Sequence, residues 1–199
     1  TLDNTEFASQ FINIAQTKTF RIRNIGGLTL NVSSITLDNT ADFSITASTP
    51  FVIAGATYTD FTITFQPQSM GDRTAIVTIV SSDLTDSPYT FTIKGLGKNA
   101  EIGVTGNAVD IPNGNTAISA TDNTFIGDAN GNPANPSTVS QNFVISNSGN
   151  VALTISGITI SGADASQFSV SPTTTSIAAG ATGIITVTFA PTSIGIKNA

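Results

Sequence analysis

The chain has 199 residues, of which 10% are charged, with seven basic and 13 acidic side chains and a formal net charge of −6. It contains no histidine and no cysteine, which excludes disulfides, thiolate or imidazole metal sites, and Ser/His or Cys/His catalysis. The acidic balance argues against a nucleic-acid partner, and no apolar run approaches the ~20 residues of a membrane helix.

The first elements follow an alternating pattern that predicts half-buried strands. In the segment 17–24, Phe20 and Ile22 point inward while Arg21 and Arg23 point outward, and a turn follows at 24–27. The next run, 28–37, slips from spacing two to spacing three at Ser33-Ser34, which predicts a bulge or a break.

The middle of the first half continues with short strands. Residues 42–46 form one, and 57–65 form the most clearly alternating one, which Pro67 ends before a turn at Gly71. Two further strands then place two sets of side chains inward: Ala75, Val77 and Ile79, followed by Tyr89, Phe91 and Ile93. We expect a domain boundary within 95–100.

The second half begins with a strand that carries Ile102 and Val104, and continues with a loop from Asp110 to Ser140 that we expect to be the most irregular part of the chain. From there the sequence repeats the first half at an offset of about 124 residues. FQPQSMGDRTA (65–75) returns as FAPTSIGIKNA (189–199), and Phe143 and Phe168 correspond to Phe20 and Phe43.

Many short strands, separated by turns rich in Gly, Pro and Asn, predict an all-β fold of two tandem antiparallel β-sandwiches. We place the domains at 1–97 and 100–199. The first copy should lack its first strand, and the second should be incomplete at its C-terminal end, because the strands that hold Val77 to Ile93 have no second copy. We therefore expect a piece of a longer polypeptide whose second copy is not self-sufficient.

The repeated pattern resembles a known family. The motifs F-x-I-x-N-x-G, F-x-P-x-S-x-G-x-x-x-A and S-P-Y-x-F-x-I-x-G are similar to those of the choice-of-anchor D repeat, which is related to the Ig-like domains named for ASPM, SPD-2 and Hydin. The resemblance implies an Ig-like fold in tandem arrays of large secreted or cell-surface proteins, often of Bacteroidota with type IX secretion. It transfers no catalytic residues.

One loop has the composition of a cation site. Asp128, Asn130 and Asn132 alternate oxygen ligands as calcium loops do, but the position that should hold a bidentate Glu is Val139. Asn and Asp beside Gly are also ordinary turn formers. We favour the turn and keep calcium as the alternative, so no metal or other cofactor is expected.

The acidic residues offer pairs that could act as general acid and base, as in glycosidases. The pairs are Asp83 with Asp86 and Asp38 with Asp42, and the available glutamates are Glu6 and Glu101. Because aspartates in turns bond their own backbone, we interpret all four aspartates as solvated turn residues.

Two other features bear on ligands. Without tryptophan, Tyr58 and Phe51 are the candidates for stacking on a sugar, although packing at the core or its rim is the interpretation we favour. Asn31-Val32-Ser33 is a formal glycosylation sequon inside a predicted strand.

The sequence leaves three functions open. The first is a non-catalytic structural or adhesive module, a spacer at the cell surface whose partners are neighbouring repeats and possible surface glycans or proteins. The second is an accessory carbohydrate- or calcium-binding module of a secreted enzyme. The third, an intracellular scaffold, is disfavoured by the scarcity of Lys and Glu.

Overall fold

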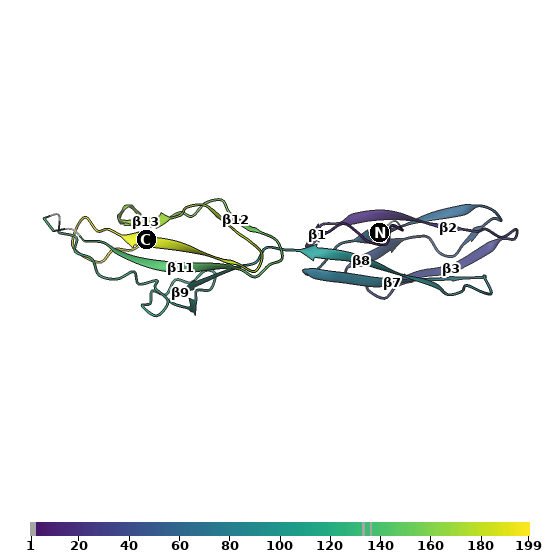
Figure 1. Cartoon of the computed structure of the whole chain (residues 1–199), viewed down its shortest axis with the longest axis horizontal. Coiled ribbons are helices and arrows are strands. Elements are labelled where there is room, and N and C mark those ends of the chain that lie inside the picture. The colour runs from purple at the N-terminus through teal and green to yellow at the C-terminus, as the bar shows by residue number, and fades with distance from the viewer. Residues whose placement is uncertain (1–2, 133, 136) are drawn as a thin grey trace. The chain divides into compact units, whose positions relative to one another are not determined.

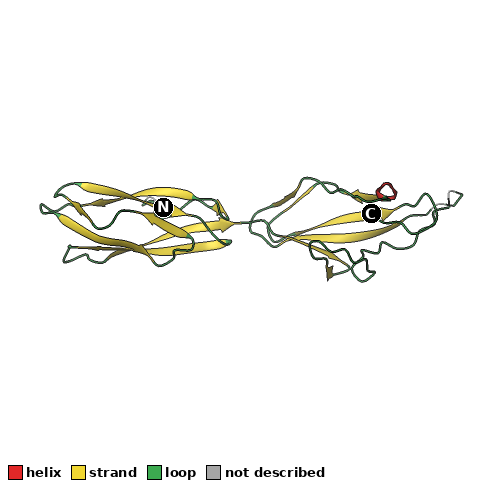
Figure 2. Cartoon of the chain, turned by 180° about the vertical axis from the view of Figure 1, so that it is seen from behind, coloured by secondary structure: helices red, strands yellow, loops and turns green. Residues whose placement is uncertain are grey.

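The computed structural model describes residues 3–132, 134–135 and 137–199. The chain is all-β and divides into two compact units, residues 1–99 (unit 1) and 100–199 (unit 2). Helical structure in the described ranges is limited to one 3-10 turn, η1 (Ala165–Gln167), drawn red in Figure 2. No helix among these residues is long and apolar enough to cross a membrane.

Unit 1 is a sandwich of two sheets with strand orders β1-β8-β7-β3-β5 and β2-β6-β4 (Figure 1). Only β1 and β8 pair in parallel among its described strands. The bounds are β1 (Gln10–Phe11), β2 (Gln16–Arg23), β3 (Leu30–Leu37), β4 (Phe43–Thr46), β5 (Phe51–Ile53), β6 (Tyr58–Phe65), β7 (Gly71–Ser81) and β8 (Tyr89–Lys98).

The alternation in the sequence decides which side chains the two sheets bury. Arg21 and Arg23 are exposed on β2, as predicted, and Arg21 lies directly opposite Asp60 of β6. The predicted irregularity at Ser33-Ser34 is confirmed as a bulge, because the register of β3 with β7 shifts between Val32 and Ser34. One face of β3 can therefore stay in the core on both sides of the extra residue.

The core of unit 1 is closed by β7 and β8. Val77 and Ile93 are fully buried between the sheets, and Ala75 and Ile79 are also buried. Tyr89, predicted to point inward, is instead 56% exposed with its ring 6.4 Å from that of Phe91. Tyr89 is the first residue of β8, so it shares the face of Phe91 but lies beyond the depth of the core.

Unit 2 has one five-stranded sheet, β10-β9-β11-β15-β13, and a two-stranded sheet, β12-β14. The described residues between β10 and β11 contain no strand or helix, which confirms the predicted irregular segment. The bounds are β9 (Ile102–Gly106), β10 (Val109–Asp110), β11 (Val139–Asn147), β12 (Leu153–Ile155), β13 (Phe168–Ser171), β14 (Thr175–Ile177) and β15 (Thr182–Phe189).

The repeat in the sequence is a repeat in three dimensions. Phe65 pairs with Phe43 across β6 and β4, and Phe189 pairs with Phe168 across β15 and β13. The two ring pairs are stacked with centroids 4.9 and 4.7 Å apart. The hydroxyl pairs Thr17/Thr64 and Ser140/Thr188 also correspond, at 2.8 and 2.7 Å between oxygens. Thus the same strands meet in the same register in both units.

The two units differ at their edges. In unit 2, β9 pairs with the edge of β11, whereas the corresponding edge of β2 has no strand partner in the described part of unit 1. Conversely, the described residues of unit 2 contain no counterpart of β7 and β8. The strand equivalent to β3, which has eight residues, is β12, which has three. A strand that loses its neighbour loses the hydrogen bonds that keep it extended.

Candidate functional site

The repeated asparagine of each unit ties a turn to the opposite strand. Asn24 is buried; its amide nitrogen donates to the carbonyls of Leu28 and Ile53 at 2.7 and 3.0 Å, and its Oδ1 accepts from the Gly26 N–H at 3.0 Å. Asn147 repeats these contacts with Val151, Ile177 and Gly149. The asparagine of the F-x-I-x-N-x-G motif is therefore a buried structural residue whose amide oxygen and nitrogen are both hydrogen-bonded.

Asp42 is 1% exposed, which corrects its interpretation as a solvated turn residue. Its Oδ1 accepts from the Gln68 N–H at 2.9 Å, and its Oδ2 accepts from Asn39 at 3.0 Å and from Arg73 at 2.8 Å. Burial would raise the pKa of Asp42, but the hydrogen bonds from Gln68, Asn39 and Arg73 outweigh it and hold that pKa below its usual value. Because both oxygens are engaged, this carboxylate is a structural anion.

Unit 2 contains the same polar cluster with acid and amide exchanged. Asp164 stands at the position of Asn39, and Gln167 stands at the position of Asp42. The Gln167 amide donates to Asp164 Oδ1 at 3.1 Å, its Oε1 accepts from the Thr192 N–H at 3.1 Å, and Lys197 Nζ lies 3.9 Å from Asp164 Oδ1. One cation, one carboxylate and one amide therefore meet beside the motif proline in each unit.

The other acidic candidates do not form an acid–base pair. Asp83 Oδ1 accepts from the Thr85 and Asp86 N–H groups at 2.9 and 3.1 Å, and its hydrogen bonds to Thr85 lower its pKa. Asp38 accepts from the Ile76 N–H at 2.7 Å. Each of these carboxylates caps the backbone of a turn or a strand end.

Glu6 lies in unit 1, and Glu101 lies in unit 2, directly before β9. Glu6 forms a parallel bridge with Lys94, and Glu101 donates its backbone N–H to Asn147 Oδ1 at 3.1 Å. The described ranges hold no group of three or more carboxylate, imidazole or thiolate side chains that could bind a metal.

The calcium candidate adopts successive turns. Asp128, Asn130 and Asn132 are all exposed. Oδ1 of Asn130 accepts from the Asn132 N–H at 3.0 Å, and Oδ1 of Asn132 accepts from the Ala134 N–H at 3.0 Å. Both amide oxygens therefore bond backbone two residues ahead, as turn asparagines do.

The sugar-stacking candidates occupy different environments. Phe51 is partly buried and packs against the core of unit 1. Tyr58 is 55% exposed, but the Arg21 guanidinium lies 3.6 Å from its ring centroid and is fixed there by two hydrogen bonds to Asp60 at 2.7 and 2.8 Å. One face of the Tyr58 ring is thus covered by a cation.

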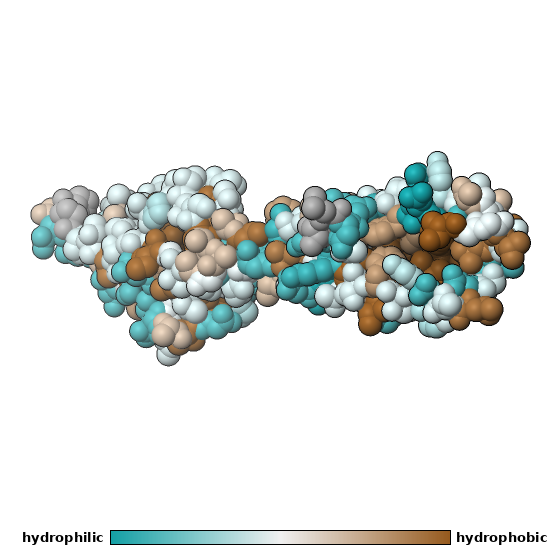
Figure 3. Space-filling model, turned by 45° about the vertical axis from the view of Figure 1, so that its right-hand side comes forward, coloured by the Kyte–Doolittle hydropathy of each residue, from teal (hydrophilic) through white to brown (hydrophobic). Residues whose placement is uncertain are grey.

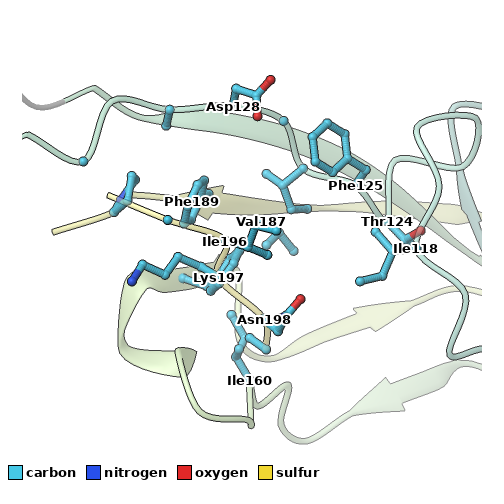
Figure 4. A pocket seen from close by; sticks show the side chains of 18 of the residues that line it. Ile118, Thr124, Phe125, Asp128, Ile160, Val187, Phe189, Ile196, Lys197 and Asn198 are labelled. Atoms are coloured by element: carbon cyan, nitrogen blue, oxygen red, sulfur yellow. The ribbon is translucent and has the colours of Figure 1, made fainter. Parts of the chain in front are cut away.

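Unit 2 contains a cleft with a volume of about 1140 Å³, lined by Phe143, Phe168, Val187 and Phe189 from its strands. Ile118, Phe125, Ile160 and Ile196 come from segments outside the strands and surround the same space (Figure 4). Apolar side chains also reach the surface of the molecule between polar ones (Figure 3). The cleft lies beside the sheet that contains β11, β13 and β15, and its lining includes Phe189, Pro191 and Ser193 of the repeated motif.

Residues 1–96 and 131–198 match the HYDIN/CFA65/VesB-like, Ig-like domain family. The chain belongs to that family. The two matched ranges cover most of both units, in agreement with the duplicated strands and clusters. The family match therefore identifies both units as Ig-like domains. No curated protein sequence matches the chain.

Several solved structures resemble the fold. They include the PapD-like domain 7 of human CEP192 (14% identity, TM-score 0.38, 49% of this chain and 84% of that chain). They also include a protein of unknown function from Porphyromonas gingivalis W83 (10%, 0.34, 92% and 78%) and the secreted serine protease VesC from Vibrio cholerae (8%, 0.40, 92% and 44%). At these identities and scores the likenesses say nothing about what the chain does.

Proposed function

We propose that the chain is a non-catalytic structural module of a large extracellular or cell-surface protein, in which Ig-like units act as spacers or as a presentation stalk. The observation that carries this proposal is the duplication of the polar clusters and stacked rings, which hold the same strands in each unit. The carboxylates Asp38, Asp42 and Asp83 serve the same purpose, because each bonds backbone or an adjacent side chain.

The proposal also covers the type of repeat and the route of export. The motifs support a choice-of-anchor D type of repeat in an array exported by a bacterium of the Bacteroidota, with type IX secretion as the route. The partners are then neighbouring repeats of the same polypeptide and glycans or proteins of the cell surface. The net charge of −6 supports the exclusion of nucleic acid. Protease added to intact source cells should cleave the protein if it is displayed outside, whereas resistance until lysis would contradict display.

The absence of catalysis and of a dedicated ligand site can be tested directly. Titration calorimetry with calcium chloride and a glycan array should give no heat and no specific hits, because the Asn130 and Asn132 oxygens are engaged in turns and the Tyr58 ring is stacked by Arg21. Calcium binding that disappears in Asp128→Ala, or glycan binding that disappears in Tyr58→Ala, would favour the accessory module instead. Hydrolysis of a polysaccharide or peptide that is lost on changing a single aspartate would contradict the proposal altogether.

A further inference from the structure

The irregular segment between β10 and β11 contains two Asn-Gly pairs, Asn113-Gly114 and Asn130-Gly131. Before a glycine, the backbone nitrogen can attack the side-chain amide of the asparagine, because glycine has no Cβ to obstruct the approach. Whether this reaction takes place in a folded protein depends on how firmly the local backbone is held. The two pairs have the same residues in the same segment, and they differ in this respect.

Asn113 and Gly114 are the central residues of an exposed turn, which the Asn115 N–H closes by donating to the Pro112 carbonyl at 3.0 Å. Gly114 has a φ of 80°, as the third residue of a type II turn requires, and a Cβ built on it would meet nothing within 4 Å. Within the described ranges, the side chain of Asn113 has no hydrogen bond. A single backbone hydrogen bond therefore closes this turn.

Asn130 and Gly131 are fixed on both sides. The Asn130 N–H donates to Ser137 Oγ at 2.6 Å, and the Ser137 N–H donates to the Asn130 carbonyl at 3.0 Å. Oδ1 of Asn130 also accepts from the Asn132 N–H. Gly131 is buried, and a Cβ built on it would overlap the Ser193 carbonyl. These hydrogen bonds and this packing must yield before the Gly131 nitrogen can approach the Asn130 side chain.

We propose that Asn113 is a site of spontaneous covalent modification, at which the side-chain amide becomes a carboxylate through a cyclic imide, and that the fold protects Asn130 from the same reaction. The nitrogen of Gly114 gives up its proton and bonds Cγ of Asn113. The bond from Cγ to Nδ2 breaks, and Nδ2 leaves as ammonia with that proton. Water then opens the ring at either carbonyl, which yields aspartate or isoaspartate.

The product differs from the parent chain in charge and in backbone length. Each event adds one negative charge to the formal net charge of −6. In the isoaspartate form the backbone runs through the side chain of residue 113, which lengthens the turn between Pro112 and Asn115 by one carbon. Because the pair lies outside the strands of unit 2, the sheets should keep their fold. This modification does not depend on the spacer role.

The full 199-residue chain can be incubated at mildly alkaline pH, digested at acid pH, and analysed by mass spectrometry and isoaspartate-specific methylation. In the folded chain, Asn113 should react more than about tenfold faster than Asn130, whose reaction requires local opening against several hydrogen bonds. In strong denaturant the two rates should agree within about threefold, because the same dipeptide is then unrestrained at both places. This contrast separates the effect of the fold from that of the sequence.

Matched variants identify the reacting atoms. Gly114→Ala hinders the attack and should slow the reaction of Asn113 by at least about tenfold. Asn113→Gln should abolish modification of the turn, because the longer side chain closes a less favourable ring. Asn115→Gln changes another exposed asparagine of the same turn and should leave the rate at Asn113 within about threefold of the parent. The rate should rise with pH, since the attacking nitrogen must lose its proton.

Three results would overturn the proposal. The first is equal rates at Asn113 and Asn130 in the folded chain. The second is reaction of Asn113 in denaturant but not in the folded chain, which would show that the turn protects it. The third is an unchanged rate in Gly114→Ala together with no isoaspartate, which would show direct hydrolysis of the side-chain amide without the cyclic intermediate.

Discussion

Gly95, the last residue of the S-P-Y-x-F-x-I-x-G motif, faces the ring of Phe65 in the core of unit 1. A Cβ added at Gly95 would overlap that ring, whereas one added at Gly27 would meet nothing within 4 Å. Gly95→Ala should therefore lower the free energy of unfolding of unit 1 by about 1–3 kcal/mol through overpacking. Gly27→Ala is the control and should change it little. Equal effects in denaturant titrations would show that Phe65 can move aside.

The polar cluster around Asp42 can be tested by substitution, because unit 2 holds the equivalent cluster with its acid and amide exchanged. Asp42→Gln leaves Arg73 without its carboxylate and should cost about 1.5–3 kcal/mol, the range for hydrogen bonds to charged groups. The double change Asp42→Gln/Asn39→Asp copies the arrangement of Gln167 and Asp164 and should recover part of that loss. If the double variant is no more stable than Asp42→Gln, the two clusters are not equivalent.

The same carboxylate predicts a pH dependence. The pKa of Asp42 is lowered in the folded state, so its stabilising effect is complete above the ordinary value of 3.8 and is lost as the pH falls through the lower folded value. The difference in unfolding free energy between wild type and Asp42→Asn should therefore be constant near neutral pH and shrink below 3.8. Denaturant titrations of both proteins across that range measure it. A difference that persists at the lowest pH would mean that the ionised form is not what stabilises the unit.

At the scale of elements, the sequence predicted the strands well because alternation reports which face is buried. Phe20, Ile22 and their neighbours lie as expected, and the slip at Ser33-Ser34 located a bulge. Alternation does not report depth, so Tyr89 was placed inward although it begins its strand and is exposed. Alternation also cannot show whether a segment has a neighbouring strand to pair with. Residues 156–160 have the sequence pattern of β3 but do not form a strand.

The polar contacts of Asp42 were hard to predict because they join residues that are far apart in the sequence. The carboxylate of Asp42 bonds Arg73 and Gln68, which lie 31 and 26 residues away in the sequence. A prediction from the residues next to Asp42 could not include these two partners. Phe7 is buried among three aromatic rings and one cation, and it lies in a segment without periodicity. The exchange of Asn39/Asp42 for Asp164/Gln167 was the one signal in the aligned repeats that could have revealed the cluster.

At the scale of the whole molecule, the two units differ in how far their cores are closed. The buried apolar cluster of unit 1 includes Ala75, Val77, Ile79 and Ile93, all supplied by β7 and β8. Burial of an aliphatic side chain of the size of Val or Ile contributes about 1.5–3 kcal/mol. Without these strands, the described part of unit 2 keeps fewer buried apolar residues, among them Phe143, Ile145, Ile177 and Phe189. A few such side chains amount to the net stability of a typical domain, about 5–15 kcal/mol.

Unit 2 should therefore unfold at a lower denaturant concentration than unit 1 in the full chain. Hydrogen exchange resolves the two units without a fluorescent label: amides of β15 should lose protection before those of the equivalent strand β6, because stability varies between cooperative units of one chain. Phe61 and its counterpart Ile185 provide a matched pair, since both lie in the middle of these strands. Simultaneous loss of protection in β6 and β15 would show that unit 2 is as stable as unit 1.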